Sequence, residues 1–169
     1  MATFPNLRGV VLVLLLALAL AGCATGPRYD AEGVEADLSP ADVAADPEPW
    51  VGSRVIWGGR ILGTEHLEEA TVVEMIAYPL DRSQRPATTM APTGRFLIDH
   101  PGFLETADYA DGRRLTVTGT VIAVREGRVG ERTLTYPVVV PDDLHLWHEP
   151  AAYPSEPRVR FGVGIMISR

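Results

Sequence analysis

The stretch RLTVTGTVIAV, residues 114–124, gives the clearest indication of the fold of this chain. Its side chains alternate between two faces, as they do in a β-strand. One face carries apolar or small residues, namely Leu115, Val117, Gly119, Val121 and Ala123. This two-residue alternation, in a run rich in Val and Thr, predicts a half-buried strand.

Similar stretches lie on both sides of this strand. Strands are expected at 54–62, 71–78, 94–100 and 129–140, with a short final piece at 144–147. We expect a bend or bulge at Gly58-Gly59, a loop at 81–93, a short helix within 102–109 and a turn at 126–128. Three strands, a short helix and two strands predict an all-β domain at 50–150. It would be a small OB-fold-like Greek-key barrel, with a β-sandwich as the alternative.

The start of the chain predicts a lipoprotein signal peptide over residues 1–22. A positive amino terminus precedes 12 apolar residues, Val10–Ala21, which are too few to span a membrane and enough for a signal peptide. The run ends in Leu20-Ala21-Gly22-Cys23, which resembles the lipobox of bacterial lipoproteins. That resemblance implies cleavage before Cys23, a diacylglyceryl group on its sulfur and an acyl group on the new amino terminus. Two or three acyl chains anchor a protein far more firmly than one.

Residues 23–49 are interpreted as a lipidated, acidic and flexible tether. Seven acidic residues stand there against Arg28 alone, among Ala, Pro and Gly, and such a segment buries too little apolar surface to fold by itself. Ser39 followed by Pro40 predicts a capped helical turn or two at 40–45.

Residues 151–169 form a linker and a separate strand signal. Apolar residues alternate with Arg, Gly and Met along Arg158–Ser168. This strand either packs back on the domain or pairs with another chain, as in self-association or contact with an envelope protein. It cannot span a membrane alone, since its backbone groups would be unpaired.

Charge and cysteine content exclude several classes of function. The 169 residues carry 15 basic side chains, all Arg, and 22 acidic ones, for a net charge of −7. Nucleic acid is not an expected partner, because phosphate binding needs a basic surface. The single Cys excludes an internal disulfide and a cysteine-cluster metal site.

Several motifs together resemble one protein family. They are GSRVIWGGRIL at 52–62, EMIAYPLD at 74–81, GRFLI at 94–98, GFLETADYADGRRLTVTGTV at 102–121, GERTLTYPVV at 130–139 and LHLW at 144–147. In this order, and after a lipobox, they resemble the Slp family of starvation-associated outer-membrane lipoproteins. The resemblance covers about 100 residues and is weaker after Pro150.

The resemblance implies a location and a setting, but no reaction. It implies the periplasmic face of a Gram-negative outer membrane, and a link to starvation, stationary phase or acid stress. The residue after Cys23 is Ala24 rather than Asp, which also favours the outer membrane. We therefore expect a non-enzymatic protein that acts by protein interaction and needs no cofactor beyond its covalent lipid.

Few residues suggest binding chemistry. Arg95, Arg113 and Arg114 are candidate ligands for a small anionic metabolite, which is the alternative function, although such Arg residues more often form surface ion pairs. His145 and His148 are the closest His pair, but in a strand they would face opposite sides, so no metal site is predicted. No Ser stands in a nucleophile motif, and no catalytic residue is predicted.

Overall fold

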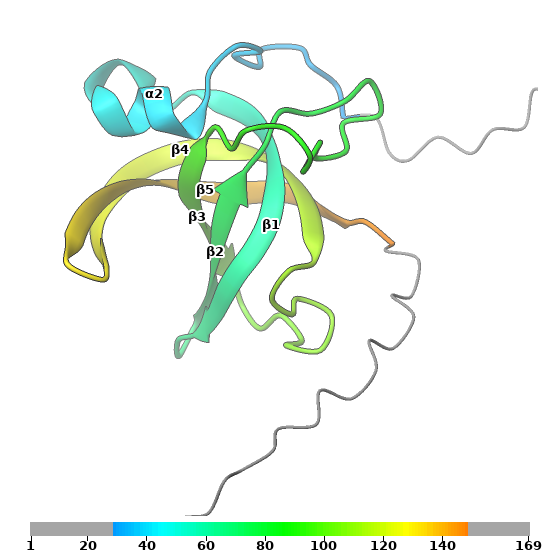
Figure 1. Cartoon of the computed structure of the whole chain (residues 1–169), viewed down its shortest axis with the longest axis vertical. Coiled ribbons are helices and arrows are strands. Elements are labelled where there is room, and N and C mark those ends of the chain that lie inside the picture. Colours follow the sequence, from blue (N-terminus) through cyan, green and yellow to red (C-terminus); the bar gives the residue numbers. More distant parts are fainter. Residues whose placement is uncertain (1–28, 149–169) are drawn as a thin grey trace, which may run out of the picture.

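Five strands form the body of the protein in the computed structural model, which describes residues 29–148. They are β1 (Arg54–His66), β2 (Ala70–Ala77), β3 (Gly94–Pro101), β4 (Arg114–Val129) and β5 (Arg132–Leu146). A short α-helix, α2 (Pro40–Ala45), and a 3-10 helix, η1 (Glu48–Trp50), precede them. Figure 1 shows α2 at one end of the barrel, on the same side as the tip of the β4–β5 hairpin.

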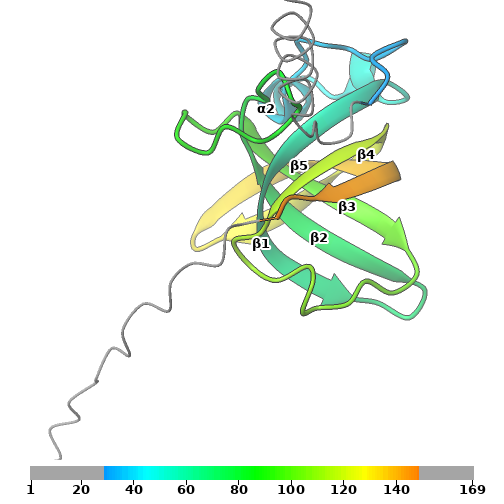
Figure 2. The same ribbon diagram turned by 90° about the vertical axis from the view of Figure 1, so that its right-hand side faces the viewer.

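The strands close into a barrel in the order β1-β2-β3-β5-β4. Neighbouring strands are antiparallel except β3 and β5, which pair in parallel through Leu97 with Val138 and Ile98 with Val139. Figure 2 shows the strands wrapping around a common axis. The all-β class is confirmed, and the arrangement fits the small five-stranded barrel expected from the sequence.

Alternating side chains fill the barrel, as the period of a strand requires. The residues that are fully shielded from solvent come from every strand, and include Val55, Ile61, Val73, Met75, Phe96, Ile98, Leu115, Val117, Val121 and Val139. Trp57 packs edge-on against Phe96, with ring centroids 5.2 Å apart. The interior is therefore filled by side chains, as in other small barrels.

Close strand packing explains two glycines. A Cβ on Gly59 would lie 2.0 Å from the carbonyl oxygen of Ile76, and one on Gly119 would lie 2.3 Å from that of Val140. The pairing of β4 with β5 shifts register next to Gly119, whereas that of β1 with β2 shifts between Ile61 and Gly63. Of the bend or bulge expected at Gly58-Gly59, the bulge lies instead between Ile61 and Gly63, and Gly59 allows β2 to approach closely.

The segment after β3 is not the helix predicted for 102–109. It forms turns, because side chains bind its backbone and draw Leu104 into the core. The Leu104 amide donates to Thr71 Oγ1 at 3.1 Å, and the Leu104 carbonyl oxygen lies 2.9 Å from His66 Nε2.

The turn predicted at 126–128 is also misplaced. β4 continues through these residues to Val129, and the chain reverses at Gly130, whose φ is +61°. β4 and β5 therefore form one long hairpin that extends beyond the barrel (Figure 1).

The described part of the predicted tether, residues 29–49, is packed on the barrel. Ser39 caps α2 as expected, and Val43 is completely buried in the core. The Trp57 indole N–H donates to the Leu38 carbonyl oxygen at 2.7 Å, and the Ala41 amide donates to Thr93 O at 3.1 Å. The expectation of a flexible segment up to residue 49 is therefore wrong for this part, because Val43 completes the barrel core.

Two groups of predictions lie outside the described residues. The first comprises the signal peptide and lipobox, with Leu20, Ala21, Gly22 and Cys23. The second is the C-terminal strand Arg158–Ser168. Within residues 29–148, no helix is both long and apolar enough to cross a membrane.

Candidate functional site: a groove on the outer face of β2 and β3

The outward side chains of β2 and β3 form the floor of a groove. Because interior and exterior residues alternate, Glu74 and Ile76 of β2 and Arg95 and Leu97 of β3 point away from the core. Cross-strand register places Glu74 opposite Leu97, and Ile76 opposite Arg95. The floor is therefore a mixture of two apolar side chains and two opposite charges.

The long β4–β5 hairpin forms one wall of this groove. Arg125 of β4 and Tyr136 of β5 stand opposite each other in the hairpin, and both line the groove. Gly127 leaves room for the Tyr136 ring, because a Cβ there would lie 2.9 Å from Tyr136 Cε2. An exposed ion pair between Arg125 Nη2 and Asp99 Oδ2, 2.8 Å long, joins this wall to β3.

Glu74, Arg95 and Tyr136 make a polar bridge across the groove. Arg95 Nη1 donates to Glu74 Oε1 at 2.9 Å, and the Tyr136 hydroxyl donates to the same oxygen at 3.1 Å. Burial, together with the charge of Glu74, raises the pKa of Tyr136, while Arg95 acts in the opposite direction. The phenol therefore remains a neutral hydrogen-bond donor over the physiological range.

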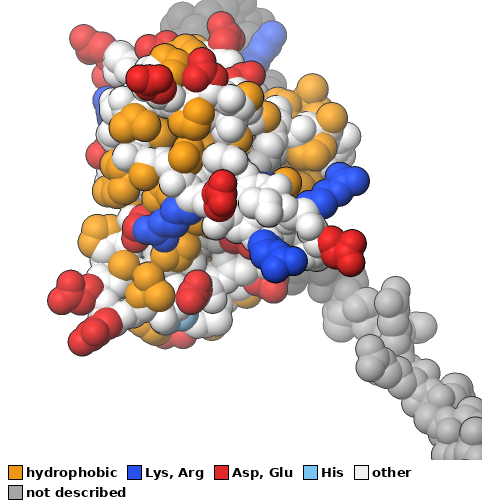
Figure 3. All heavy atoms as spheres, turned by 90° about the vertical axis from the view of Figure 1, so that its left-hand side faces the viewer, with side chains coloured by type: hydrophobic (Ala, Val, Ile, Leu, Met, Phe, Trp, Pro, Cys, Tyr) orange, Lys and Arg blue, Asp and Glu red, His pale blue; other side chains and the backbone are white. Residues whose placement is uncertain are grey.

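The residues of this bridge line two hollows. The more polar one has a volume of about 450 Å³ and is lined by Glu65, Glu74, Arg125, Arg128 and Tyr136, among others. The more apolar one, about 740 Å³, lies between α2 and the hairpin and is lined by Ala41, Ala44, Ile76, Pro92, Arg95 and Leu134, among others. Figure 3 shows apolar, acidic and basic side chains interspersed on this side of the molecule.

This arrangement suits recognition of a ligand or partner with both apolar and polar parts. The apolar hollow has the size of small-molecule sites, and both hollows are open to solvent. Among residues 29–148, no group of three His, Cys, Asp or Glu side chains is placed to hold a metal ion.

Comparison with known proteins identifies the group to which this chain belongs. Residues 20–164 match the outer membrane lipoprotein Slp family. The chain belongs to the Slp family. The match covers most of the chain and begins at the first residue of the lipobox, Leu20.

Two relatives from Escherichia coli (strain K12) support this membership. The "Uncharacterized lipoprotein YeaY" is 28% identical over 151 residues, which cover 88% of this chain and 77% of the relative. The "Outer membrane protein Slp" is 25% identical over 145 residues, which cover 85% of this chain and 77% of the relative. Membership of the Slp family thus makes the chain an outer membrane lipoprotein.

The structure separates the three arginines proposed from the sequence. Arg95 lies in the groove, whereas Arg113 and Arg114 do not line it. Arg114 instead opposes Arg60 in the pairing of β1 with β4. Of the three candidate ligands for an anion, Arg95 is therefore the one that borders the groove.

The His pair also lies away from the groove. The ring of His145, on β5, packs edge-on against Trp147, with centroids 4.5 Å apart. Burial is the main cause of a lowered pKa at His145. The His148 carbonyl oxygen accepts a long hydrogen bond from Arg85 Nη2, at 3.5 Å.

Glu74 and Tyr136 were missed by the sequence analysis. Glu74 is the one charged residue in TVVEMIAY, so its outward placement was predictable in principle, whereas the run TLTYPVVV groups Tyr136 with the apolar Leu134 and Val138 and gave no sign of it. They are 62 residues apart, however, and nothing in one sequence shows that β5 lies beside β3. Their meeting at one carboxylate oxygen required the structure.

Proposed function

We propose that this Slp-family lipoprotein is anchored through lipid on Cys23, faces the periplasm and works by binding another envelope component in its β2–β3 groove. The groove, with its polar bridge and apolar hollow, is the observation that carries the binding role. We propose a non-enzymatic role, as the family resemblance implies, in which the polar bridge is part of a recognition surface.

Lipidation of Cys23 is supported by two facts that agree. The chain has a single Cys, preceded by Leu20, Ala21 and Gly22, and the family match starts at Leu20. Mass spectrometry of the mature amino-terminal peptide tests this directly. Diacylglyceryl and acyl groups on Cys23 are expected, and an unmodified cysteine in a peptide that begins elsewhere would contradict the anchor.

Photo-crosslinking in cells tests the binding role. A photoreactive amino acid in place of Leu134, which lines the apolar hollow, is expected to crosslink to a defined envelope protein. The same replacement at the exposed Arg82, in the β2–β3 loop away from the groove, is the matched control. Equal crosslinking from both positions would contradict the assignment of the groove.

The orientation and the physiological setting belong to the same proposal. Protease added to intact cells is expected to spare the domain and to cleave it after the outer membrane is permeabilised. Loss of the protein is expected to reduce survival in stationary phase, starvation or acid, the setting that the family resemblance implies. Cleavage in intact cells would place the domain on the cell surface instead.

A small anionic metabolite is the second candidate ligand, and the position of Arg95 favours it. The Arg95 guanidinium borders the apolar hollow and shares Glu74 with Tyr136. Thermal-shift measurements with organic acids are expected to show stabilisation that Arg95→Gln removes and Arg114→Gln leaves. Equal loss in both variants would contradict a site at Arg95.

Self-association through Arg158–Ser168 is a separate part of the proposal. Native mass spectrometry of the lipidated protein, with and without the residues after Pro157, tests it. An oligomer that becomes a monomer on truncation would support it, and an unchanged mass distribution would contradict it.

A further inference from the structure

The two ends of the described chain leave the barrel on the same side. Figure 1 shows both of them opposite α2 and the tip of the β4–β5 hairpin, and Figure 2, viewed from the side of the chain ends, agrees. The loop between β2 and β3 contacts both ends, because Gln84 binds Tyr29 and Arg85 binds His148. We call the side formed by Tyr29, Gln84, Arg85 and His148 the chain-end face.

Gln84 holds the backbone of Tyr29 with two hydrogen bonds. The Tyr29 amide donates to Gln84 Oε1 at 2.6 Å, and Gln84 Nε2 donates to the Tyr29 carbonyl oxygen at 3.0 Å. Gln84 has a φ of +61°, a backbone conformation that residues other than glycine rarely adopt. The two bonds to Tyr29 offset the strain of that conformation.

The loop that carries Gln84 is itself fixed to the barrel. The Asp81 carboxylate accepts the amides of Ser83 and Arg85, at 2.7 and 3.1 Å. Thr116 Oγ1 donates to the Gln84 carbonyl oxygen at 2.8 Å, and accepts the indole N–H of Trp147 at 2.8 Å. The attachment of Tyr29 is thus continuous with the body of the barrel.

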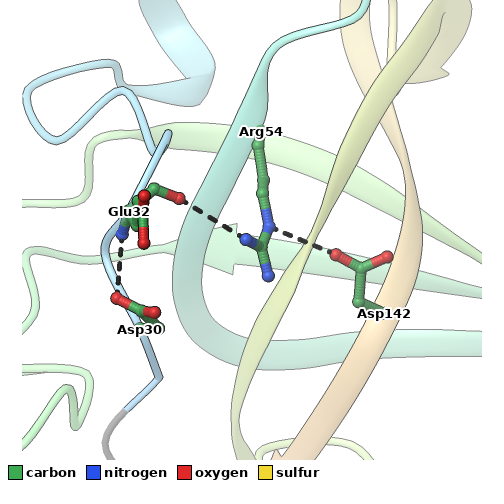
Figure 4. A network of polar contacts seen from close by, with 4 residues as sticks. All are labelled: Asp30, Glu32, Arg54 and Asp142. Atoms are coloured by element: carbon green, nitrogen blue, oxygen red, sulfur yellow. Dashed lines mark hydrogen bonds and ion pairs between the residues drawn. The ribbon is translucent and has the colours of Figure 1, made fainter.

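The residues after Tyr29 are attached as well. Figure 4 shows Arg54 of β1 between Glu32 and Asp142, with Asp30 binding the amide of Glu32. Beyond them, Val34 forms a bridge with Arg54. The Tyr29 phenol is half-buried, and burial followed by the charge of Asp143 raises its pKa.

This attachment limits how far the barrel can lie from its lipid. Cys23 is six residues before Tyr29, and a fully extended chain spans ~3.3–3.6 Å per residue, or about 20 Å in all. A domain of about 120 residues is about 35 Å across, so half its perimeter is about 55 Å. The chain from Cys23 is therefore too short to pass around the barrel.

We propose that the chain-end face rests against the lipid headgroups, with the β2–β3 groove and the hairpin tip directed away from the membrane. This inference rests on the proposed lipidation of Cys23. The exposed Arg82 stands two residues before Gln84 in the same loop, and its guanidinium is available to headgroup phosphate. The groove is then presented to partners in the space beyond the membrane.

Fluorescence quenching on lipidated protein in phospholipid vesicles tests the orientation. The only natural cysteine would carry lipid, so Arg82→Cys or Glu131→Cys would give a single free thiol for a fluorophore. A headgroup-linked quencher is expected to quench the label at position 82 severalfold more than that at position 131 in the hairpin turn. Equal quenching, or stronger quenching at position 131, would overturn the proposal.

Gln84→Gly in both labelled proteins tests the role of the attachment at Tyr29. It removes the side chain while favouring the same backbone φ, so the barrel is expected to keep its fold. The next attachment is then the bond from Arg54 to the Glu32 carbonyl oxygen, nine residues from Cys23, which allows about 30 Å. The difference in quenching between the labels at positions 82 and 131 should shrink with Gln84→Gly. It should persist with the control Ser83→Gly. A difference that Gln84→Gly leaves unchanged would contradict the attachment.

Failure of the lipid anchor and failure of the orientation are distinguishable. Protein whose amino-terminal peptide lacks lipid, and which does not bind vesicles, would refute the proposed function. Lipidated, vesicle-bound protein with equal quenching at positions 82 and 131 would refute the orientation alone.

Discussion

The chain-end face and the groove use polar side chains in different ways. On the chain-end face, side chains bind backbone atoms: Gln84 binds Tyr29 and Arg85 binds the His148 carbonyl, while Thr116, buried beneath, binds the Gln84 carbonyl. In the groove, charged side chains bind one another, as in the Arg95–Glu74 and Arg125–Asp99 pairs.

This difference separates positioning from recognition. Hydrogen bonds from side chains to the backbone fix the path of the chain, and where the partner is buried, as at Thr116, leaving it unsatisfied costs ~1–3 kcal/mol. Ion pairs near a surface contribute only ~0–1 kcal/mol, so a ligand can replace them at little cost. We therefore expect substitutions at the chain-end face to change stability and position, and substitutions in the groove to change binding.

The largest effect is expected from Thr116→Val. Thr116 is fully buried, and its hydroxyl serves both the Trp147 indole and the Gln84 carbonyl. Losing it leaves two groups unpaired, so the free energy of unfolding should fall by about 2–4 kcal/mol in urea denaturation.

Thr118→Val is the matched control for that change. Thr118 is also buried on β4, but its hydroxyl has no hydrogen-bond partner within residues 29–148. Its replacement should leave the free energy of unfolding unchanged or raise it. Equal losses of stability at both positions would show that packing, and not hydrogen bonding, determines the contribution of these two threonines.

A smaller effect is expected from Gly127→Ala in the groove wall. The new methyl would lie 2.9 Å from the Tyr136 ring, and overpacking of this kind costs about 1–3 kcal/mol. Gly63→Ala, also in the groove lining, meets open space and is the control. Thermal unfolding of both variants checks this, and an unchanged Gly127→Ala protein would mean that the ring does not pack there.

Glu74→Gln should alter the groove with little loss of stability. Breaking the part-exposed pair with Arg95 is expected to cost less than about 1 kcal/mol. The pKa of Tyr136 should fall, because the charge of Glu74 is one cause of its raised value. Ultraviolet absorbance in alkaline titration measures this. Asp99→Asn, which breaks the Arg125 pair, should leave the Tyr136 titration unchanged.

The smallest effect is expected on the pH dependence of stability, through His145. Burial lowers the pKa of His145, so the unfolded chain binds a proton more readily than the folded one. The stability that His145 contributes is present above its ordinary pKa of about 6.5 and is lost as pH falls through the folded pKa. His145→Gln should flatten the dependence of stability between about pH 8 and about pH 5. If the free energy of unfolding of the variant changes with pH as steeply as that of the unchanged protein, groups other than His145 cause the dependence.

The sequence predicted the strands well, because burial leaves a period of two in runs such as 114–124. It also predicted α2 from Ser39 and Pro40. It misjudged residues 29–49, because their composition shows a high charge but not that one Val, Val43, completes a core formed elsewhere.

The site was harder to predict for a related reason. Arg95 was singled out for its charge, but Arg113 and Arg114 looked equivalent to it in sequence and lie elsewhere in the barrel. The partners of Arg95, Glu74 and Tyr136, come from strands that meet only through barrel closure. Pairings over such distances depend on topology, which local patterns do not contain.

Amide hydrogen exchange on the lipidated protein bound to vesicles tests the central claim most directly. The claim is that residues 29–49 are fixed to the barrel from Tyr29 onward. It predicts slow exchange at the amides of Tyr29, Glu35 and Ala41, which donate to Gln84, Arg54 and Thr93. In Gln84→Gly, Tyr29 should lose protection while Ala41 keeps it. Exchange of all three amides at the rate of an unfolded chain, with the barrel still protected, would contradict the claim and restore a long flexible tether.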